Sequence, residues 1–325
     1  MARTGSSAYI QYGYESSFKG GATQAQVFGL EQKATGLRWL NNQIALGQLY
    51  STERKIFAYA KNEGSVNLEW VVSNPWYFDY IFANPETTGA GPYTHKWSSD
   101  PDFVGAGAFD NTDVRATRSG HIEMGFEGET GNEVRNAKGV ICPTLTMRTN
   151  VNDTIKCTGN FIWGREDNLV TTLDTSVASD DLNFPYTFVH ASLELPDGTV
   201  IAQIQDFELT FAPNVELIWG IGSADAAASS GKKIIDMTGR FKKAKVDKSA
   251  LEKVRNRSEE ATLEIIITNG LSGTNEKSIT LLGTGVGISE HDNDVVPGEV
   301  IFENLQWQIR SMLVTAVNNI SSPPT

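Results

Sequence analysis

Cysteine, excess basic charge and long apolar runs are all scarce in this chain of 325 residues. Two cysteines are too few for a disulfide scaffold. Acidic residues number 39 and basic residues 27, so the formal net charge is -12. Binding a phosphate backbone requires excess lysine and arginine, and this balance therefore argues against a nucleic-acid-binding protein. It still allows a protein past which DNA slides without being held.

Targeting and membrane segments are missing as well. The opening MARTGSSAYI has no apolar core of signal-peptide length, and no run approaches the length of a membrane span. We therefore expect folding in a cytoplasm, with no membrane partner. The cysteines fit a reducing compartment, because a hairpin turning at 150–153 would pair Cys157 with Thr146. Cys142 would then lie about 13 Å further along the strand, beyond the reach of a disulfide.

The motifs of common catalytic and metal sites are also absent. The four histidines are dispersed, and none has a neighbour at zinc-site spacing. No GxSxG, phosphate-loop or CxxC motif occurs. The acidic run EHDND (290–294) offers oxygen ligands but lacks the glycine of an EF-hand loop. We interpret it as a solvated acidic loop, with a calcium site as the alternative, and we expect no enzyme activity and no cofactor.

Strand patterns dominate what is present. The stretch VNLEWVVSNPWYFDYIF (66–82) begins as an alternating strand with one strongly apolar face. Asn74 and Pro75 then supply a helix N-cap and a first helical residue. The aromatic residues that follow predict a short helix with one apolar face and Asp79 outside that face. A strand that runs straight into so many aromatic side chains raises the question of what covers them.

Other segments complete the coarse assignment. Strands are predicted over 140–148 and 154–163, as a hairpin, and over 207–211, 261–268, 277–282 and 300–309. The capping box SALE (249–252) predicts a second, more polar helix. Loops are predicted over 85–92, 223–233 and 283–298, which are rich in glycine, serine, alanine or acidic residues.

An internal repeat is indicated by two glycines and a helix cap. The set Gly47, Gly64 and Asn74 recurs 175 residues later as Gly222, Gly239 and Ser249. Both halves also show the order strand, glycine-marked loop, strand, capped helix and further strands, with an extra segment near 100–121 in the first half. We predict two tandem domains, 1–165 and 185–325, joined by a linker at 166–184. Because identity between the halves is low, coincidence of loop glycines is the alternative.

Several phrases resemble the major tail tube proteins of long-tailed, siphovirus-like viruses of bacteria and archaea. These are YGYESSF (12–18), FGLE (28–31), LEWVVSNPWYF (68–78), the segment 214–223 and TGRF (238–241). They span nearly the whole chain and contain no catalytic residue.

The resemblance implies a mainly β fold of two tandem tail-tube-like β-sandwich domains, each with a short flanking helix. Their strands would join those of other subunits in a β-barrel around a lumen, and rings would stack into the tail tube of the virion. A duplicated chain implies three chains per pseudo-hexameric ring, with six chains as the alternative. The implied partners are other copies of the chain and the tail tip, tape measure and head–tail connector proteins, with assembly in the host cytoplasm. An acidic lumen would let the DNA genome pass during ejection without specific binding.

Two groups of side chains are predicted at subunit contacts. Trp76, Tyr77, Phe78 and Phe82 exceed what a short helix requires, although an ordinary core helix is the alternative. The second group, Arg240, Lys242 and Lys243, belongs to the one basic concentration of the chain. There a solvated strand face is the simple interpretation, and pairing with an acidic neighbour subunit is the alternative.

A carbohydrate-binding or adhesive β-sandwich protein is the competing functional class, because the seven tryptophans are candidate sugar platforms. Trp39, Trp70, Trp163 and Trp307 lie in strand-like surroundings, however, and we interpret them as core residues. An enzyme is the third class, and no motif favours it.

Overall fold

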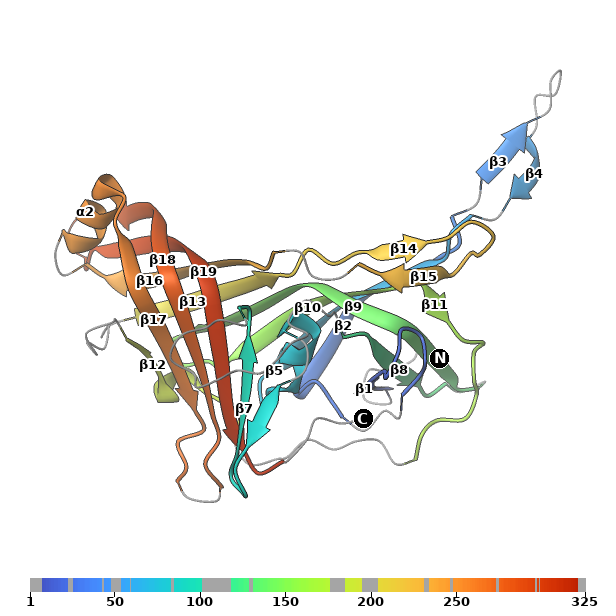
Figure 1. Ribbon diagram of the computed structural model, residues 1–325, viewed down its shortest axis with the longest axis horizontal. Helices are drawn as coiled ribbons and strands as arrows, with labels where there is room; N and C mark the ends of the chain where they lie inside the picture. Colours follow the sequence, from blue (N-terminus) through green and yellow to red (C-terminus); the bar gives the residue numbers. More distant parts are fainter. Residues whose placement is uncertain are drawn as a thin grey trace.

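The computed structural model describes residues 8–22, 26–42, 44–47, 54–58, 60–82, 85–100, 118–128, 131–175, 185–194, 204–230, 234–245, 248–272, 275–295, 297 and 299–320. Over these residues the chain is mainly β-strand with two short α-helices (Figure 1). This confirms the predicted strand-rich class. Neither of these helices is long or apolar enough to cross a membrane.

The elements of the first half, up to residue 175, are β1 (Ala8–Tyr14), β2 (Leu30–Leu40), β3 (Ile44–Gly47), β4 (Arg54–Ala58), β5 (Glu63–Val71), the 3-10 turn η2 (Trp76–Phe78), α1 (Asp79–Phe82), β6 (Glu86–Thr88), β7 (Tyr93–Ser98), β8 (Gly120–Phe126), β9 (Glu133–Asn150), β10 (Lys156–Trp163) and β11 (Arg165–Glu166). Those of the second half, from residue 185, are the 3-10 turn η3 (Phe188–His190), β12 (Ala191–Glu194), β13 (Ile204–Ala212), β14 (Leu217–Trp219), β15 (Ala226–Ser229), β16 (Asp236–Ala244), α2 (Ser249–Asn256), β17 (Glu259–Thr268), β18 (Ser278–Asp294) and β19 (Phe302–Asn318).

Both halves have the same antiparallel pairing order. In the first half the order is β2-β5-β10-β9-β8-β1. In the second half it is β13-β16-β19-β18-β17-β12. Counted along the chain, each strand of one order has its counterpart at the same place in the other. The helices also correspond, since η2–α1 follows β5 and α2 follows β16.

One of the two glycine pairs that indicated a repeat, Gly64 and Gly239, occupies matching places in these ladders, whereas Gly47 ends β3 and Gly222 lies in the turn between β14 and β15. Gly64 of β5 lies opposite Trp163 of β10, and Gly239 of β16 lies opposite Trp307 of β19. A side chain at Gly64 would clash with the Trp163 ring. Glycine is thus required there by close approach of the indole, a constraint that the strand pattern alone does not reveal.

Two strand pairs join the halves, β9 with β13 and β7 with β19. The end of β9, from Leu145 to Asn150, pairs antiparallel with 206–211 of β13. The beginning of β9, by contrast, pairs with β8. As a result β2, β5, β10, β9, β13, β16, β19, β18, β17 and β12 form one continuous sheet that crosses the molecule (Figure 1).

Aromatic side chains fill the core of the first half. Phe28 stacks on Tyr12 of β1 with ring centroids 4.2 Å apart, and it also contacts Trp70 of β5 at 5.1 Å. Phe161 of β10 packs against Tyr80 of α1 at 5.3 Å. The β1–β8 layer therefore faces the β5–β10 layer across rings, which contribute large apolar area at little entropic cost.

The aromatic helix is covered by its own chain. Every residue of η2 and α1 is buried. Its rings reach the second half, because Phe82 lies 5.6 Å from Phe211 of β13, centroid to centroid. On another side β7 supplies His95, 4.6 Å from Trp76. The predicted helix start is one residue early, because Pro75 is the N-cap of η2, although the Trp76 N–H donates to the Asn74 side chain at 3.3 Å.

Several local predictions were wrong. The predicted loops 85–92 and 223–233 contain the strands β6 and β15. The segment 283–298 is not a loop over most of its length, because β18 continues to Asp294. The β9–β10 hairpin pairs Cys157 with Met147 rather than Thr146, one residue out of the predicted register, although both cysteines are free and buried as expected. The helix α2 has Lys248 as its N-cap and Ser249 as its first residue, so the cap lies one residue before the predicted one.

The described part of the predicted linker lies against the first half. Arg165 and Glu166 pair with β9, and Val170 forms a bridge with Val134. The region 176–184 lies outside the described residues. The β6–β7 hairpin precedes the predicted extra segment 100–121, and β7 pairs with the end of β19 in the second half. Most of the extra segment, 101–117, is likewise outside the described residues.

Candidate assembly surface

One side of the long sheet carries polar side chains that no other element of the described chain covers. We call it the polar face. Residues directly opposite each other on paired strands point to the same side, and the ladder registers place on this face Lys33, Arg38, Ser65, Asn67, Glu69, Thr144, Thr146, Arg148, Lys156, Thr158, Asn160, Asp206, Glu208, Thr210, Thr238, Arg240, Lys242, Glu290, Asp292, Asn304, Gln306 and Gln308. Threonine and amide side chains here alternate with charges of both signs.

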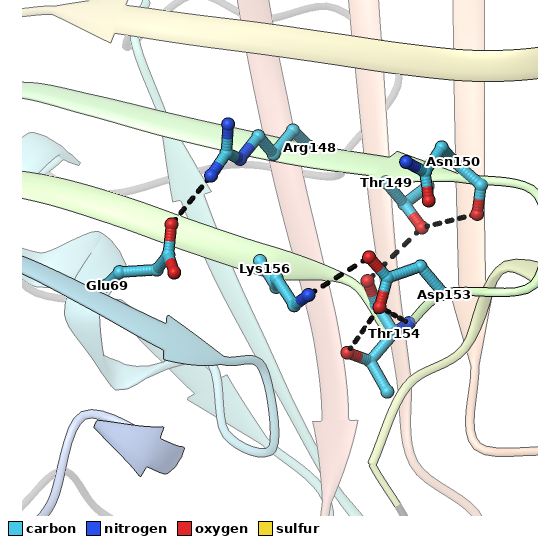
Figure 2. Close-up of polar contacts among 7 residues, drawn as sticks. All are labelled: Glu69, Arg148, Thr149, Asn150, Asp153, Thr154 and Lys156. Carbon is cyan, nitrogen blue, oxygen red and sulfur yellow. Dashed lines mark hydrogen bonds and ion pairs between the residues drawn. The ribbon is translucent and has the colours of Figure 1, made fainter. Parts of the chain in front are cut away.

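The polar face is best organised where the halves meet. Arg148 of β9 lies opposite Glu208 of β13, and its guanidinium is 2.6 Å from the Glu69 carboxylate (Figure 2). Next to it, the hydroxyls of Thr146 and Thr210 lie 3.0 Å apart across the same strand pair. This pair of strands, β9 and β13, which we call the joint, is therefore held by side-chain contacts as well as by backbone hydrogen bonds.

The β9–β10 turn closes one end of the joint. Asp153 accepts hydrogen bonds from the Thr154 backbone at 2.7 Å and from Lys156 at 3.0 Å (Figure 2). The bond from Lys156 holds the pKa of the Asp153 carboxyl below its ordinary value. Between this turn and β13 lies a hollow of about 330 Å³, lined by side chains such as Asn150, Asp206 and Arg240. Its lining mixes both charges, which gives it no marked preference for an anion or a cation.

The predicted aromatic contact group lies inside the chain. Trp76, Phe78 and Phe82 are 0% exposed and Tyr77 is 1% exposed. Among the described residues, therefore, these rings already have covering neighbours. Their burial supports the core-helix alternative, and a direct contact with another subunit would need this segment to open.

The predicted basic group lies within a strand that is paired on both sides, β16. The Arg240 guanidinium is 3.3 Å from Glu208 on the polar face. Lys242 stands 5.1 Å from the centroid of the Phe302 ring. Lys243 points to the opposite face, where its ammonium is 2.9 Å from the buried Glu303 carboxylate. Arg240 and Lys243 thus have acidic partners in their own chain.

Sequence reasoning missed three buried carboxylates: Glu303, which pairs with Lys243, and Asp79 and Glu15. Asp79, expected outside the apolar face, is 0% exposed. It accepts a hydrogen bond from Trp97 Nε1 at 2.7 Å and forms an ion pair with Arg118 at 2.6 Å. These partners are distant in sequence, so only a charged residue inside an aromatic run could have drawn attention to the site.

Another missed carboxylate is Glu15, in the YGYESSF phrase. It accepts hydrogen bonds from the Ser119 hydroxyl at 2.7 Å and from the backbone N–H groups of Lys19 and Gly139 at 2.9 and 3.0 Å. It holds the segment after β1 against β8 and β9. The phrase that carries the family resemblance is thus a structural brace rather than a reactive site.

The acidic run EHDND lies in β18, and its side chains alternate between the two faces. Glu290 and Asp292 lie on the polar face, whereas His291 bonds to the buried Glu303 at 3.0 Å. Within the described part of the chain, no group of three or more His, Cys, Asp or Glu side chains is positioned to hold a metal ion. The run was therefore wrongly interpreted as a loop, and its acidic side chains belong to the surface of the sheet.

Comparison with known proteins agrees with this picture of a structural surface. A search of curated proteins finds no match. The family model described as phage tail tube protein matches residues 5–308, nearly the whole chain. On this evidence the chain belongs to the phage tail tube protein family.

Proposed function

We propose that this chain builds the wall of a viral tail tube as stacked rings of three copies, each copy contributing two tube domains. The observation that carries the proposal is the shared pairing order of the halves on one continuous sheet. Two equivalent domains per chain would give a three-chain ring the outline of a six-fold one. The domain division is then 1–165 and 185–325, with 166–184 running along the first domain.

We assign the polar face to the lumen of this tube. The net charge of the chain is -12, but the polar face itself carries both signs. Arg148 is held by Glu69, and Arg240 by Glu208. DNA would meet cations already neutralised by carboxylates, within a wall of negative overall charge, and its phosphates would gain little by binding. This arrangement suits conduction of the genome during ejection.

The other partners follow from a tube of this kind in the virion. Its ends would bind a tail tip complex and a head–tail connector, and a tape measure protein would occupy the lumen during assembly in the host cytoplasm. None of these roles requires a catalytic group or a cofactor.

A carbohydrate-binding role receives less support. Sugar platforms require exposed tryptophan faces, whereas five of the seven tryptophans are buried: Trp70, Trp76, Trp97, Trp163 and Trp307. Trp39 packs partly buried against the core, and Trp219 lies under the ammonium of Lys61, 4.1 Å from the ring centroid.

Electron microscopy of the purified chain, alone and with added tail tip complex, tests the proposal. Rings or tubes with a central channel are expected, and native mass spectrometry should find three chains per ring. A chain that sediments only as a monomer at high concentration, with no tube under either condition, would refute the tube. Rings of six chains would refute the stoichiometry alone.

A further inference from the structure

A cavity opens beneath α2, on the side of the long sheet opposite to the polar face. It has a volume of about 60 Å³, and we call it the α2 cavity. The residues of β16 and β19 that line it alternate along their strands with those of the polar face, so they point the other way. Its apolar wall includes Phe241, Val286, Ile288, Leu305 and Trp307, and α2 contributes Ala250.

The first half shows how such a helix is closed. There β7 brings Trp97 to the corresponding helix, with ring centroids 6.1 Å from Trp76 and 6.0 Å from Phe78, and all three rings are buried. The second half has no hairpin in the corresponding place, because only residues 257 and 258 separate α2 from β17. The α2 cavity therefore lies where this half lacks a covering side chain like Trp97.

A polar group of the cavity wall also lacks a partner. Trp307 is 4% exposed, and its indole N–H has no hydrogen-bond acceptor within the described parts of the chain. A buried donor without an acceptor is unfavourable, and a bound acceptor removes that cost. A peptide carbonyl or a carboxylate is an acceptor of this kind. The cavity thus suits a ligand that combines an apolar side chain with such oxygen atoms.

Positive charge without a counter-charge lies next to the cavity. The lysines that line it, Lys243 and Lys253, each have a glutamate partner in the same chain. Arg255 and Arg257, at the end of α2, are exposed, and neither forms an ion pair with another described residue. Arg257 follows Lys253 by about one helical turn. On a chain of net charge -12, these arginines favour an acidic partner.

We propose that the α2 cavity is a docking site on the outer wall of the tube for an acidic segment of another protein. The segment inserts one apolar side chain of the size of valine or leucine, which packs against Ala250 and Leu305. A carbonyl group of the same segment accepts a hydrogen bond from Trp307 Nε1, and its carboxylates pair with Arg255 and Arg257.

The position on the outer wall rests on the proposed function. The polar face is assigned there to the lumen, and the α2 cavity lies on the other side of the sheet. A protein that joins a finished tube from outside meets this side. Docking within the subunit itself requires only the cavity and the two arginines, so it is tested separately from the tube.

Peptide probes test the contact on the full-length subunit. The probe is the blocked peptide Asp-Glu-Leu-Asp-Glu, and its matched controls replace the leucine with alanine or all the acidic residues with lysine. In protein labelled with 5-fluorotryptophan, fluorine NMR follows Trp307, whose signal is identified with Trp307→Phe. The leucine probe should shift this signal, the alanine probe should bind at least about tenfold more weakly, and the lysine probe should leave it unchanged. No shift at millimolar leucine probe, or an equal response to the alanine probe, overturns the proposal.

Three variants separate packing from charge. Ala250→Leu fills the cavity with the chain's own side chain, so it should abolish the shift without lowering the melting temperature. Arg255→Gln/Arg257→Gln should weaken the leucine probe by about tenfold and remove most of the salt dependence of its binding. The control Lys242→Gln removes a positive charge from the polar face of β16 and should bind the probe normally. A loss in the control as large as in the arginine variant would assign the binding to net charge and overturn the site.

Thiol labelling places the cavity in the assembled tube. Ser249 lines the cavity and is exposed, whereas both native cysteines are buried. A maleimide should therefore label the Ser249→Cys variant equally fast in subunits and in tubes. Protection in tubes would assign the cavity to a second copy of the chain and overturn docking of another protein. If no tubes form, the proposed function fails, and the peptide titration still decides whether the cavity binds an acidic segment.

Discussion

The two helical segments occupy the same place in the pairing order but differ in every other respect. Residues 76–82 of η2 and α1 are all buried, whereas Ala250 is the only buried residue of α2. The first half adds the β6–β7 hairpin, which lies against its helix and brings Trp97 to it. The second half has no such hairpin between α2 and β17, and a cavity of about 60 Å³ remains between α2 and the sheet.

This difference shows what the aromatic content of a helix indicates about its surroundings. An insertion that covers a helix turns a surface element into a core element, and the helix then acquires side chains suited to burial on all sides. The excess of aromatic residues in 76–82 indicates that the helix is buried on all sides. It does not reveal whether the residues that bury it belong to the same chain or to a neighbouring subunit. Burial of these rings within the single chain favours cover by the same chain, and their place at a subunit contact stays a prediction.

The largest expected effect on subunit stability comes from removing an aromatic side chain of the covered helix. Trp76→Ala should lower the free energy of unfolding of the dissociated subunit by about 3–5 kcal/mol, because it empties a fully buried site. The matched change in the open helix, Leu251→Ala, should cost about 1 kcal/mol or less, since Leu251 is half-buried.

Thermal melts and thiol labelling measure both variants. Burial raises the pKa of the Cys157 thiol to about 12 and that of the Cys142 thiol further still, so neither reacts until the first half opens. Faster labelling is expected for the first variant only. A Trp76→Ala subunit with an unchanged melt that fails to form rings would restore the interface interpretation of this helix.

The next largest effect concerns the buried carboxylate of Asp79, in the same helical segment. Asp79→Asn should cost about 2–4 kcal/mol, because it leaves the largely buried Arg118 without its counter-charge while keeping an acceptor for Trp97. Adding Arg118→Met should recover part of that loss in a double-mutant cycle by urea unfolding. If the double variant is less stable by the full sum of the single effects, the two groups are not coupled.

Acid should weaken the first half before the second. Burial lowers the pKa of His121 and of His95 below 6.5. The unfolded chain therefore binds protons at a higher pH than the folded chain does. The stability that the neutral rings contribute is complete above about pH 6.5 and is lost as the pH falls from there toward the lowered pKa values.

The melting temperature of the subunit between pH 7.5 and 5 tests this sign. His121→Gln should flatten the acid limb, because glutamine does not titrate, whereas the exposed His190→Gln should leave the limb unchanged. An equally steep limb in both variants would place the acid sensitivity outside the buried histidines.

Local patterns predicted much of this fold because they act over neighbouring residues. Alternation in 66–72 identified β5, and the glycines at 64 and 239 marked the two ladders in which a tryptophan lies opposite. Pairing between halves was out of reach, since nothing in the composition of β9 selects β13 over the other strands. Only the charge match of Arg148 with Glu208 hints at it.

The missed parts share one physical cause, polar groups that bond inside the protein. The glycine and acidic content of 283–298 predicts a loop, but in β18 the inward side chains His291 and Asn293 have the partners Glu303 and Lys245. A strand whose inward side chains are polar and hydrogen-bonded has the low hydropathy of a loop, although its backbone is that of a strand. Asp79 was placed outside the helix face for the same reason.

The smallest expected effect belongs to the outer face of α2. Lys248 and Glu252 form an i,i+4 ion pair at 2.7 Å, with side chains 80% and 50% exposed. Water screens such a pair, and its charges remain hydrated in either state, so Glu252→Gln should change the free energy of unfolding by only about 0.3–0.5 kcal/mol. The difference should vanish near 1 M salt, where the screening length falls to about 3 Å.

A matched pair in the first half supplies the contrast. Arg135 and Glu166 make two hydrogen bonds, at 2.6 and 2.9 Å, with side chains only 12% and 8% exposed. Glu166→Gln should therefore cost about 1.5–3 kcal/mol, and salt should reduce that cost much less. Urea unfolding of the two variants at low and high salt measures both differences. If the α2 pair proved as costly as the β9–β11 pair, α2 would have to be covered in the dissociated subunit, and the contrast between a closed first half and an open second half would fail.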